Sequence, residues 1–179
     1  MKVLILGDTH IPRRAKWLPR RIELFLSKEK FDVVLCTGDL TDERVLEYLE
    51  GLGEVFVVRG NMDHLPFQEV RWLKVEDLKV GLIHGHQVYP RGNREQLKEI
   101  AVKMDVDLLV SGHTHSPDIY LDDVLLLNPG SATGAWGGGG GSLKPSFMVL
   151  EVSGRNLEVY LYELEDRLRC KVGKKFTFG

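Results

Sequence analysis

Histidine, aspartate and asparagine side chains gather in five short segments of this sequence, which hold five of its six histidines. The candidate metal-ligating residues are Asp8, His10, Asp39, Asn61, His84, His113 and His115. Imidazole combined with carboxylate and amide oxygen is a mixed set of N and O ligands, which suits Mn, Fe, Zn, Co or Ni better than Ca or Mg. So many candidates exceed the needs of one tetrahedral site and suit two ions with one bridging carboxylate. The sequence therefore predicts two divalent metal ions, which can hold a hydroxide between them and neutralise a phosphoryl group.

Each segment also has a purely structural explanation when it is taken alone. Asp-x-His and Gly-Asp often form ordinary turns, and Gly60-Asn61 is a common turn dipeptide. The pairs His84-Gly85-His86 and His113-Thr114-His115 carry more weight as ligands, because residues i and i+2 of an extended chain point the same way. Taken together and in this order, the segments favour a metal site over a set of unrelated turns.

Short apolar runs lie directly before these segments and predict the strands that position them. The expected strands are Val3–Leu6, Val33–Cys36, Val55–Val58, Val80–Ile83 and Leu108–Val110. Helical spacing predicts helices at Leu18–Lys28 and Asp42–Glu50, with Asp42 as a possible cap. Alternating strands and helices imply parallel strands with right-handed crossovers. Because ligands bind at the carboxyl ends of such strands, the polar segments are expected to converge there.

The second half of the chain is rich in strand signals. Beyond the runs above, it predicts a strand at Val70–Val75, a helix at Arg94–Lys103, and hairpins at Asp118–Leu121 with Val124–Leu127 and at Phe147–Val152 with Leu157–Tyr162. This pattern predicts a second sheet packed on the first. Gly137–Gly141 is a flexible loop by composition, either a mobile cover near the site or a tether between strands.

Composition bounds the class of protein. A chain of 179 residues with 43% hydrophobic and 28% charged residues fits one globular domain, spanning 1–179. The formal net charge of -2 does not indicate a nucleic-acid partner, and the basic cluster at Arg13–Arg21 reads as a solvated loop and helix start. Only two cysteines, Cys36 and Cys170, suit a reducing compartment. The first apolar run is too short for a signal peptide or a membrane span, so a cytoplasmic protein is expected.

The five polar segments, in this order, resemble those of the calcineurin-like metallophosphoesterase superfamily. The motifs are Asp8-Thr9-His10, Gly38-Asp39, Gly60-Asn61, His84 and Gly112-His113-Thr114-His115. The likeness spans nearly the whole chain and implies an α/β/β/α sandwich of four layers with two mixed sheets. Within the superfamily, the chain is most similar to the small phosphodiesterases of bacteria and archaea. It is closer still to the metallophosphoesterase-like subunit of the eukaryotic retromer sorting complex.

The resemblance also implies roles for single residues. Asp8, His10 and His115 would hold one ion, and Asn61, His84 and His113 the other. Asp39 would bridge the two ions, and Asp39, Asn61 and His84 would also serve catalysis. The retromer subunits have lost ligands at the positions of Asp39 and Asn61, whereas this chain keeps both, which favours a working site.

Other positions depart from the superfamily pattern or carry weaker implications. Met62 stands where many of these enzymes have a histidine that assists the leaving group, so the general acid is in question. His86 or His64 could substitute for it, and Asp63 is expected to orient a ligand histidine. Asn128–Ser131 is either a plain turn or a turn whose N–H groups face phosphate.

Two functions from different classes follow from this pattern. The first is a metal-dependent phosphoesterase that hydrolyses phosphodiesters with a hydroxide activated by two metal ions. Its partner would be a small phosphoester substrate. The alternative is a protein-interaction scaffold with a vestigial or structural metal site, in which case a protein partner or a second copy of the chain would bind.

Overall fold

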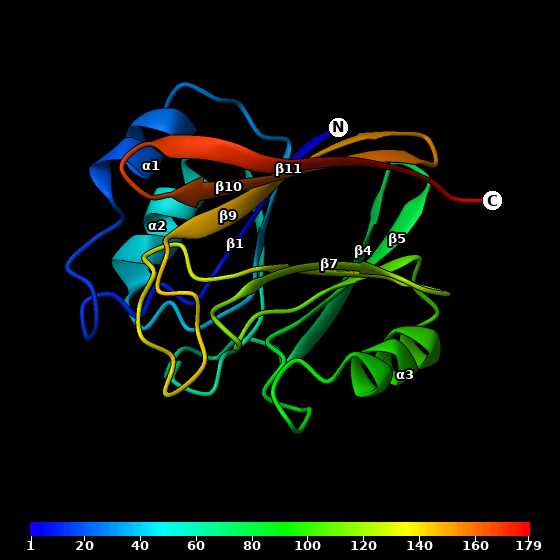
Figure 1. Cartoon of the computed structure of the whole chain (residues 1–179), viewed down its shortest axis with the longest axis horizontal. Coiled ribbons are helices and arrows are strands. Elements are labelled where there is room, and N and C mark those ends of the chain that lie inside the picture. Colours follow the sequence, from blue (N-terminus) through cyan, green and yellow to red (C-terminus); the bar gives the residue numbers. More distant parts are fainter.

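The computed structural model describes residues 1–179 and contains two β-sheets that pack face to face (Figure 1). The first sheet has the order β11-β10-β9-β1-β2-β3. Its strands are β1 (Lys2–Leu6), β2 (Val33–Cys36), β3 (Glu54–Val57), β9 (Ser146–Ser153), β10 (Asn156–Leu164) and β11 (Leu168–Thr177). The second sheet has the order β4-β5-β6-β8-β7. Its strands are β4 (Val70–Val75), β5 (Leu78–Ile83), β6 (Leu108–Val110), β7 (Pro117–Leu121) and β8 (Leu125–Pro129).

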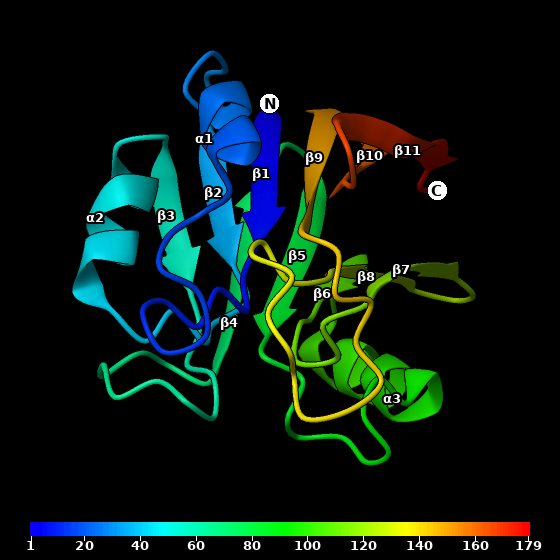
Figure 2. The ribbon, with the colours of Figure 1, turned by 60° about the vertical axis from the view of Figure 1, so that its left-hand side comes forward.

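Helices cover the outer face of each sheet. The helices α1 (Arg20–Leu26) and α2 (Glu43–Glu50) lie on the first sheet, and α3 (Arg94–Met104) lies on the second (Figure 2). Asp42 caps α2 as expected, because its side chain accepts a hydrogen bond from the Arg44 N–H. The first helix is shorter than the predicted Leu18–Lys28, since Pro19 has an extended ψ of 132° and only precedes the first turn.

Burial on both faces of the central strands explains their continuous apolar sequences. Val3 and Ile5 of β1 belong to the core between the two sheets, whereas Leu4 and Leu6 belong to the core under α1 and α2. Successive side chains of a strand point to opposite faces, so a strand buried on both sides needs an unbroken apolar run. The result is the four-layer α/β/β/α sandwich that the resemblance implies.

Two features of the sheets differ from the sequence-based expectation. The strands after residue 145 do not extend the second sheet, because β9 pairs with β1 antiparallel and thus joins β10 and β11 to the first sheet. The edge strand β11 was not predicted. It has no apolar run, its residues are mostly exposed, and its pairing with β10 holds it in place. Such a strand depends on long-range pairing and carries little local signal.

The remaining global features are simple. No helix is long and apolar enough to cross a membrane. Both cysteines are free, with Cys36 buried in the core and Cys170 exposed.

Candidate metal centre

The candidate ligands lie in five loops at one edge of the molecule. Three of these loops follow the parallel strands β1, β2 and β3 of the first sheet, and two follow the parallel strands β5 and β6 of the second. Figure 2 shows the carboxyl ends of these strands directed toward the same end of the sandwich, where the loops meet. The expectation that the polar segments converge is therefore met by both sheets together.

A first group of ligand atoms is formed after β1 and β6. His10 Nε2 lies 3.1 Å from His115 Nε2, and His115 Nε2 lies 3.4 Å from Asp8 Oδ1. All three side chains are buried. Two ring nitrogens and one carboxylate oxygen thus face a common point within the protein.

A second group is formed after β3, β5 and β6. His84 Nε2 lies 3.1 Å from Asn61 Oδ1 and 3.2 Å from His113 Nδ1. His84 is buried, His113 is half-buried and Asn61 is exposed. This group is therefore the side of the centre that opens to solvent.

Asp39 lies between the two groups. Its Oδ2 atom is 3.4 Å from His10 Nε2 and 3.5 Å from His84 Nε2, and its side chain is 2% exposed. Asp39 Oδ1 accepts a hydrogen bond of 2.8 Å from the Met62 N–H, which leaves Oδ2 directed at both groups. The structure thus brings all seven sequence-predicted side chains into one cluster, with Asp39 at its middle.

Two of the histidines are held by backbone carbonyls. His84 Nδ1 lies 2.7 Å from Thr37 O, and His115 Nδ1 lies 2.6 Å from Ala135 O. A ring N–H that donates to a carbonyl fixes the tautomer and leaves Nε2 as the free lone pair. Both Nε2 atoms point into the cluster, so these two rings are set up as ligands.

Backbone strain is concentrated in the same loops. Of nine non-glycine residues with positive φ, five are candidate ligands, namely Asp8, His10, Asp39, His113 and His115. Each such residue costs on the order of 1 kcal/mol and persists where the surroundings force it, which is typical of functional sites. Gly60 adds a close approach, since a Cβ there would lie 2.0 Å from Asp39 Oδ1.

The burial and charge of two carboxylates in the cluster show whether the residues present fit a divalent cation. Asp8 Oδ1 is buried and has no hydrogen-bond donor, and a buried carboxylate oxygen is costly without a partner. Burial also raises the pKa of the Asp39 carboxyl. Both effects favour a cation in the cluster, and the N/O donor set suits a first-row transition metal or zinc.

The electrostatic environment keeps two of the rings neutral. Burial lowers the pKa of His10 to about 4, and the charges of His115 and Arg14 add to this effect against the opposing charge of Asp8. Burial likewise lowers the pKa of His113 to about 4, with contributions from His84 and Arg91. Neutral imidazole is the form that binds a metal ion, so both rings are ready to ligate at neutral pH.

Asp63 has a role that differs from the expected one. Its carboxylate does not orient a histidine, because it accepts hydrogen bonds from the backbone N–H groups of Asp39, Gly60 and Thr41 at 2.7, 2.9 and 2.9 Å. It therefore fixes the backbone on both sides of the bridging position. No local sequence pattern indicates this role, since the three donors belong to two separate loops.

Replacing Asp63 with asparagine should lower the free energy of unfolding by about 1–3 kcal/mol, because an amide group would face a buried N–H that now has an acceptor. Urea denaturation of the metal-free protein measures this loss. Asp123→Asn is the matched control, since Asp123 is 75% exposed. An equal, small loss in both variants would contradict the role given to Asp63.

Several other expectations need correction. His113 and His115 do not point the same way, because both lie in left-handed turns and face different groups of the cluster. Of the two histidines considered as substitute proton donors, His86 lies beside the cluster, with its ring 5.4 Å from that of His84, whereas the exposed His64 contacts Arg13. In the segment from Asn128 to Ser131, the Gly130 N–H donates to Asn128 Oδ1, and Pro129 has no N–H to offer a phosphate. The buried side chains of this segment brace the ligand loops, with Asn128 Nδ2 donating to Gly112 O and Ser131 Oγ to Asp8 O.

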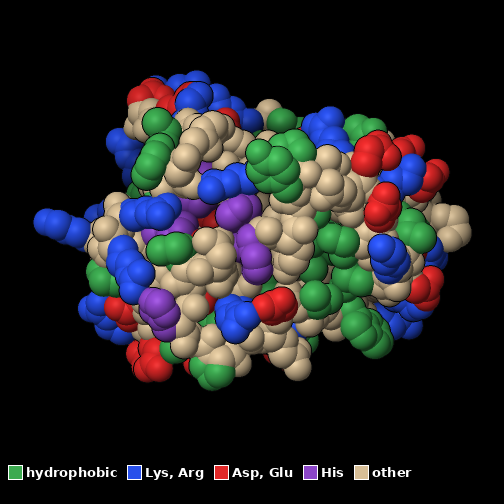
Figure 3. Space-filling view, turned by 90° about the horizontal axis from the view of Figure 1, so that it is seen from below, with side chains coloured by type: hydrophobic (Ala, Val, Ile, Leu, Met, Phe, Trp, Pro, Cys, Tyr) green, Lys and Arg blue, Asp and Glu red, His purple; other side chains and the backbone are tan.

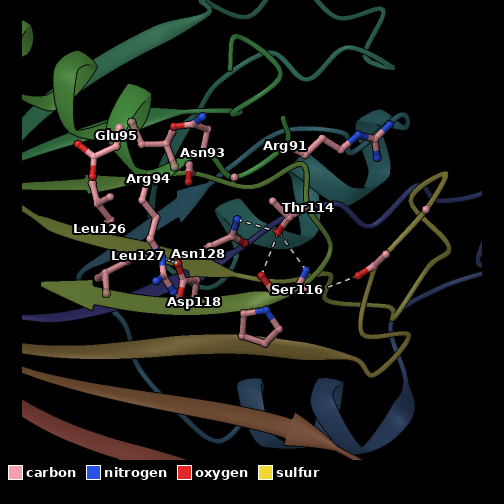
Figure 4. Close-up of a pocket in the computed structure, with 16 residues that line it drawn as sticks. Arg91, Asn93, Arg94, Glu95, Thr114, Ser116, Asp118, Leu126, Leu127 and Asn128 are labelled. Atoms are coloured by element: carbon pink, nitrogen blue, oxygen red, sulfur yellow. Dashed lines mark hydrogen bonds and ion pairs between the residues drawn. The ribbon is translucent and has the colours of Figure 1, made fainter. Parts of the chain in front are cut away.

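A separate cavity of about 630 Å³ lies beside the cluster and is drawn in Figure 4. None of the seven candidate ligands lines it, although Thr114, between two of them, does. Arg91 and Asn128 contribute to its wall, and the ion pair of Arg94 with Asp118 lies at one side. The cavity is thus a neighbour of the candidate metal centre and does not contain its ligands.

Comparisons with known proteins agree with this geometry. A probable metallophosphoesterase of Methanocaldococcus jannaschii is 43% identical over 136 residues, which cover 74% of this chain and 69% of the relative. Vacuolar protein sorting 29 (Vps29) of Cryptosporidium parvum superposes with a TM-score of 0.94 at 33% identity, covering 99% of this chain and 98% of the other. Vps29 of Entamoeba histolytica, solved in complex with Zn²⁺, gives a TM-score of 0.87 at 37% identity, covering all of both chains.

A model of a protein family also matches this chain. Residues 1–155 match the calcineurin-like phosphoesterase superfamily domain, and this stretch includes every candidate ligand. The retromer-subunit likeness noted in the sequence is matched by the Vps29 structures, and the phosphoesterase likeness by the archaeal relative. This chain belongs to the calcineurin-like phosphoesterase superfamily.

Proposed function

We propose that this chain is a metal-dependent phosphoesterase that hydrolyses phosphodiesters. The observation that carries the proposal is the position of Asp39 Oδ2, 3.4 Å from His10 Nε2 and 3.5 Å from His84 Nε2. A carboxylate oxygen so close to both groups of donors is suited to bridge two ions. When bound, two divalent ions supply a nucleophilic hydroxide near neutral pH and neutralise charge on a phosphoryl group.

Each residue of the cluster has a role in this proposal. Asp8, His10 and His115 hold one ion, and Asn61, His84 and His113 hold the other, with Asp39 shared. Thr37 O and Ala135 O orient His84 and His115 through their Nδ1 atoms. Because the second group includes the exposed Asn61 and half-buried His113, the substrate phosphate approaches from that side.

The charge around the cluster supports an anionic substrate. Figure 3 shows histidine side chains on one face of the molecule with lysine and arginine side chains gathered around them. Arg14 and Arg91 are among the charges close enough to lower the pKa of His10 and His113, respectively. A cationic rim raises the local concentration of a phosphoester and speeds its association.

Metal removal and replacement test the proposal. Protein treated with a chelator should lose turnover of bis(p-nitrophenyl) phosphate, and addition of Mn, Zn, Ni, Co or Fe should restore it. Metal binding should also raise the melting temperature, because an ion that binds only the native state stabilises it. Undiminished turnover in protein shown to be free of metal would refute the metal-dependent mechanism.

The Vps29 likeness supports a second candidate function, a protein-interaction scaffold with a structural metal site. A TM-score of 0.94 over nearly the whole chain is the observation that favours it. Metal removal and replacement also distinguish the two candidate functions, because a scaffold would bind metal and gain stability without hydrolysing any diester. The intact Asp39 and Asn61 favour the enzyme.

We further propose that the protein works in the cytoplasm as a single domain. Two unpaired cysteines, one of them exposed, are consistent with a reducing compartment.

A further inference from the structure

The loop between β8 and β9 lies directly on the candidate metal centre. Ala135 O accepts a hydrogen bond from His115 Nδ1, and His115 O accepts one from the Ser142 N–H at 3.1 Å. A Cβ on Gly137 would lie 2.8 Å from two atoms of the His115 ring. Only glycine lets the backbone approach the ring this closely, so the loop is fitted to His115 and is more than a tether.

Two arginines from distant parts of the chain hold this loop. Arg14 Nη1 donates a hydrogen bond of 2.6 Å to Trp136 O, and Arg91 Nη1 donates one to Gly137 O. Arg14 follows β1 and Arg91 follows β5, so consecutive carbonyls of the loop are bound from both sheets. The position of Trp136 relative to His115 is therefore fixed by contacts of its neighbours on both sides.

The Trp136 indole itself is largely free. It is 62% exposed, and its cation–π contact is with Arg14, whose guanidinium carbon lies 6.0 Å from the ring centroid. The glycines that follow leave the surroundings open, since a Cβ on Gly139 or Gly140 would meet nothing within 4 Å. A large flat side chain is thus presented to solvent one residue away from the carbonyl that orients His115.

We propose that Trp136 binds a flat aromatic substituent of the substrate, an aryl ring or a nucleobase, by stacking. The inference rests on the proposed function, because it places the phosphate at the metal centre, of which His115 is a candidate ligand. A substituent that extends from this phosphate meets Trp136 as a fixed, exposed aromatic surface. Stacking of a ring on an aromatic side chain tolerates different rings, since every base has a π-face. The chain would therefore prefer aromatic phosphoesters without selecting one base.

The surroundings favour a small anionic ligand over a protein partner. Arg14 and Arg91 flank the loop, and the face seen in Figure 3 carries lysine and arginine side chains around the histidines. A cationic surrounding raises the local concentration of a small anionic ligand. In a ligand that carries a ring and a phosphate, the ring can stack on the Trp136 indole and the phosphate is attracted by the two nearby guanidinium groups.

Competitive inhibition by monoesters with and without a ring tests the inference. Phenyl phosphate and adenosine monophosphate carry a ring, whereas methyl phosphate does not. Trp136→Ala should raise the inhibition constants of the two aromatic esters by about 5- to 100-fold, the range expected for loss of one stacking contact. The constant for methyl phosphate should stay within about twofold, and Trp136→Phe should retain most of the preference for rings.

Trp72→Ala is the matched control, because Trp72 is 64% exposed on β4, outside the loops of the metal centre. It should change none of the constants. An equal loss for all three ligands in Trp136→Ala would mean that the loop is merely disturbed, and no loss at all would mean that Trp136 does not touch the substrate. Either result overturns the inference.

A binding readout separates this inference from the proposed function. In a Trp17→Phe, Trp72→Phe background, where Trp136 is the one remaining tryptophan of the three, metal-loaded protein titrated with adenosine monophosphate should show quenching of Trp136 fluorescence, and methyl phosphate should not cause it. Ring-dependent quenching without any turnover would support stacking on Trp136 while the phosphodiesterase proposal fails. Turnover with no ring dependence in either assay would overturn the stacking role of Trp136 while the phosphodiesterase proposal stands.

Discussion

Replacing Asp39 by asparagine should lower kcat/KM for bis(p-nitrophenyl) phosphate by about 10³-fold or more, which corresponds to the several kcal/mol that metal ions contribute to such reactions. The neutral amide keeps the shape and can still accept the hydrogen bond from the Met62 N–H. It cannot supply the negative oxygen that faces His10 and His84 in the same way. Both ions should therefore bind more weakly, and metal analysis should show the loss together with the loss of turnover.

The stability of this variant should depend on the metal. Burial raises the pKa of Asp39, so its ionised form opposes folding of the metal-free protein at neutral pH. Asparagine removes that cost, and the metal-free variant should be at least as stable as the metal-free wild type. With metal added, the wild type should gain more in melting temperature than the variant does.

Asp77→Asn serves as the control for this experiment, since its side chain is 64% exposed and lies in the turn between β4 and β5, at the opposite end of β5 from His84. It should leave turnover and metal content unchanged. Full activity in a metal-depleted Asp39→Ala protein would contradict the two-metal model.

Replacing Met62 by histidine should make the enzyme less dependent on its leaving group. A thioether cannot protonate a departing alkoxide, so the wild type should cleave activated aryl diesters and react slowly with alkyl esters. General acid catalysis contributes about 10²- to 10⁴-fold, and the variant should recover part of this for poor leaving groups. It should gain little for p-nitrophenolate, which leaves readily without a proton.

The measurement is kcat/KM plotted against leaving-group pKa for both proteins. Met62 is half-buried and follows the candidate ligand Asn61, so an imidazole there starts at the open side of the centre. A shallower slope in Met62→His supports the account. If both slopes are equal, His86→Ala shows whether His86, whose ring lies 6.3 Å from that of His113, already supplies the proton.

The strands and the convergence of the ligand loops were predictable because each rests on local sequence. Four or five apolar residues followed by Gly-Asp describe both a strand buried on two faces and the loop that ends it, as at Leu6 and Cys36. Parallel strands then bring their loops to one edge without further information. The expected convergence of the polar segments follows from these two facts, whereas the four layers and the roles of the seven candidate ligands came from the resemblance to the superfamily.

Features that depend on long-range contacts were not predictable. Nothing local indicates that Asp63 accepts three backbone N–H groups, or that Arg14 and Arg91 bind consecutive carbonyls of one loop. The directions of His113 and His115 were misjudged because the extended-chain rule does not apply at positive φ. The edge strand β11 was missed because its partner β10, not its own sequence, keeps it in the sheet.

The central claim is that two ions are held around Asp39, and anomalous diffraction from crystals of the manganese- or zinc-loaded protein tests it most directly. The account predicts two anomalous peaks on either side of Asp39 Oδ2, one beside His10 and His115 and the other beside His84 and His113. The same preparation should hydrolyse bis(p-nitrophenyl) phosphate. A single peak, or none, in fully active protein would contradict it.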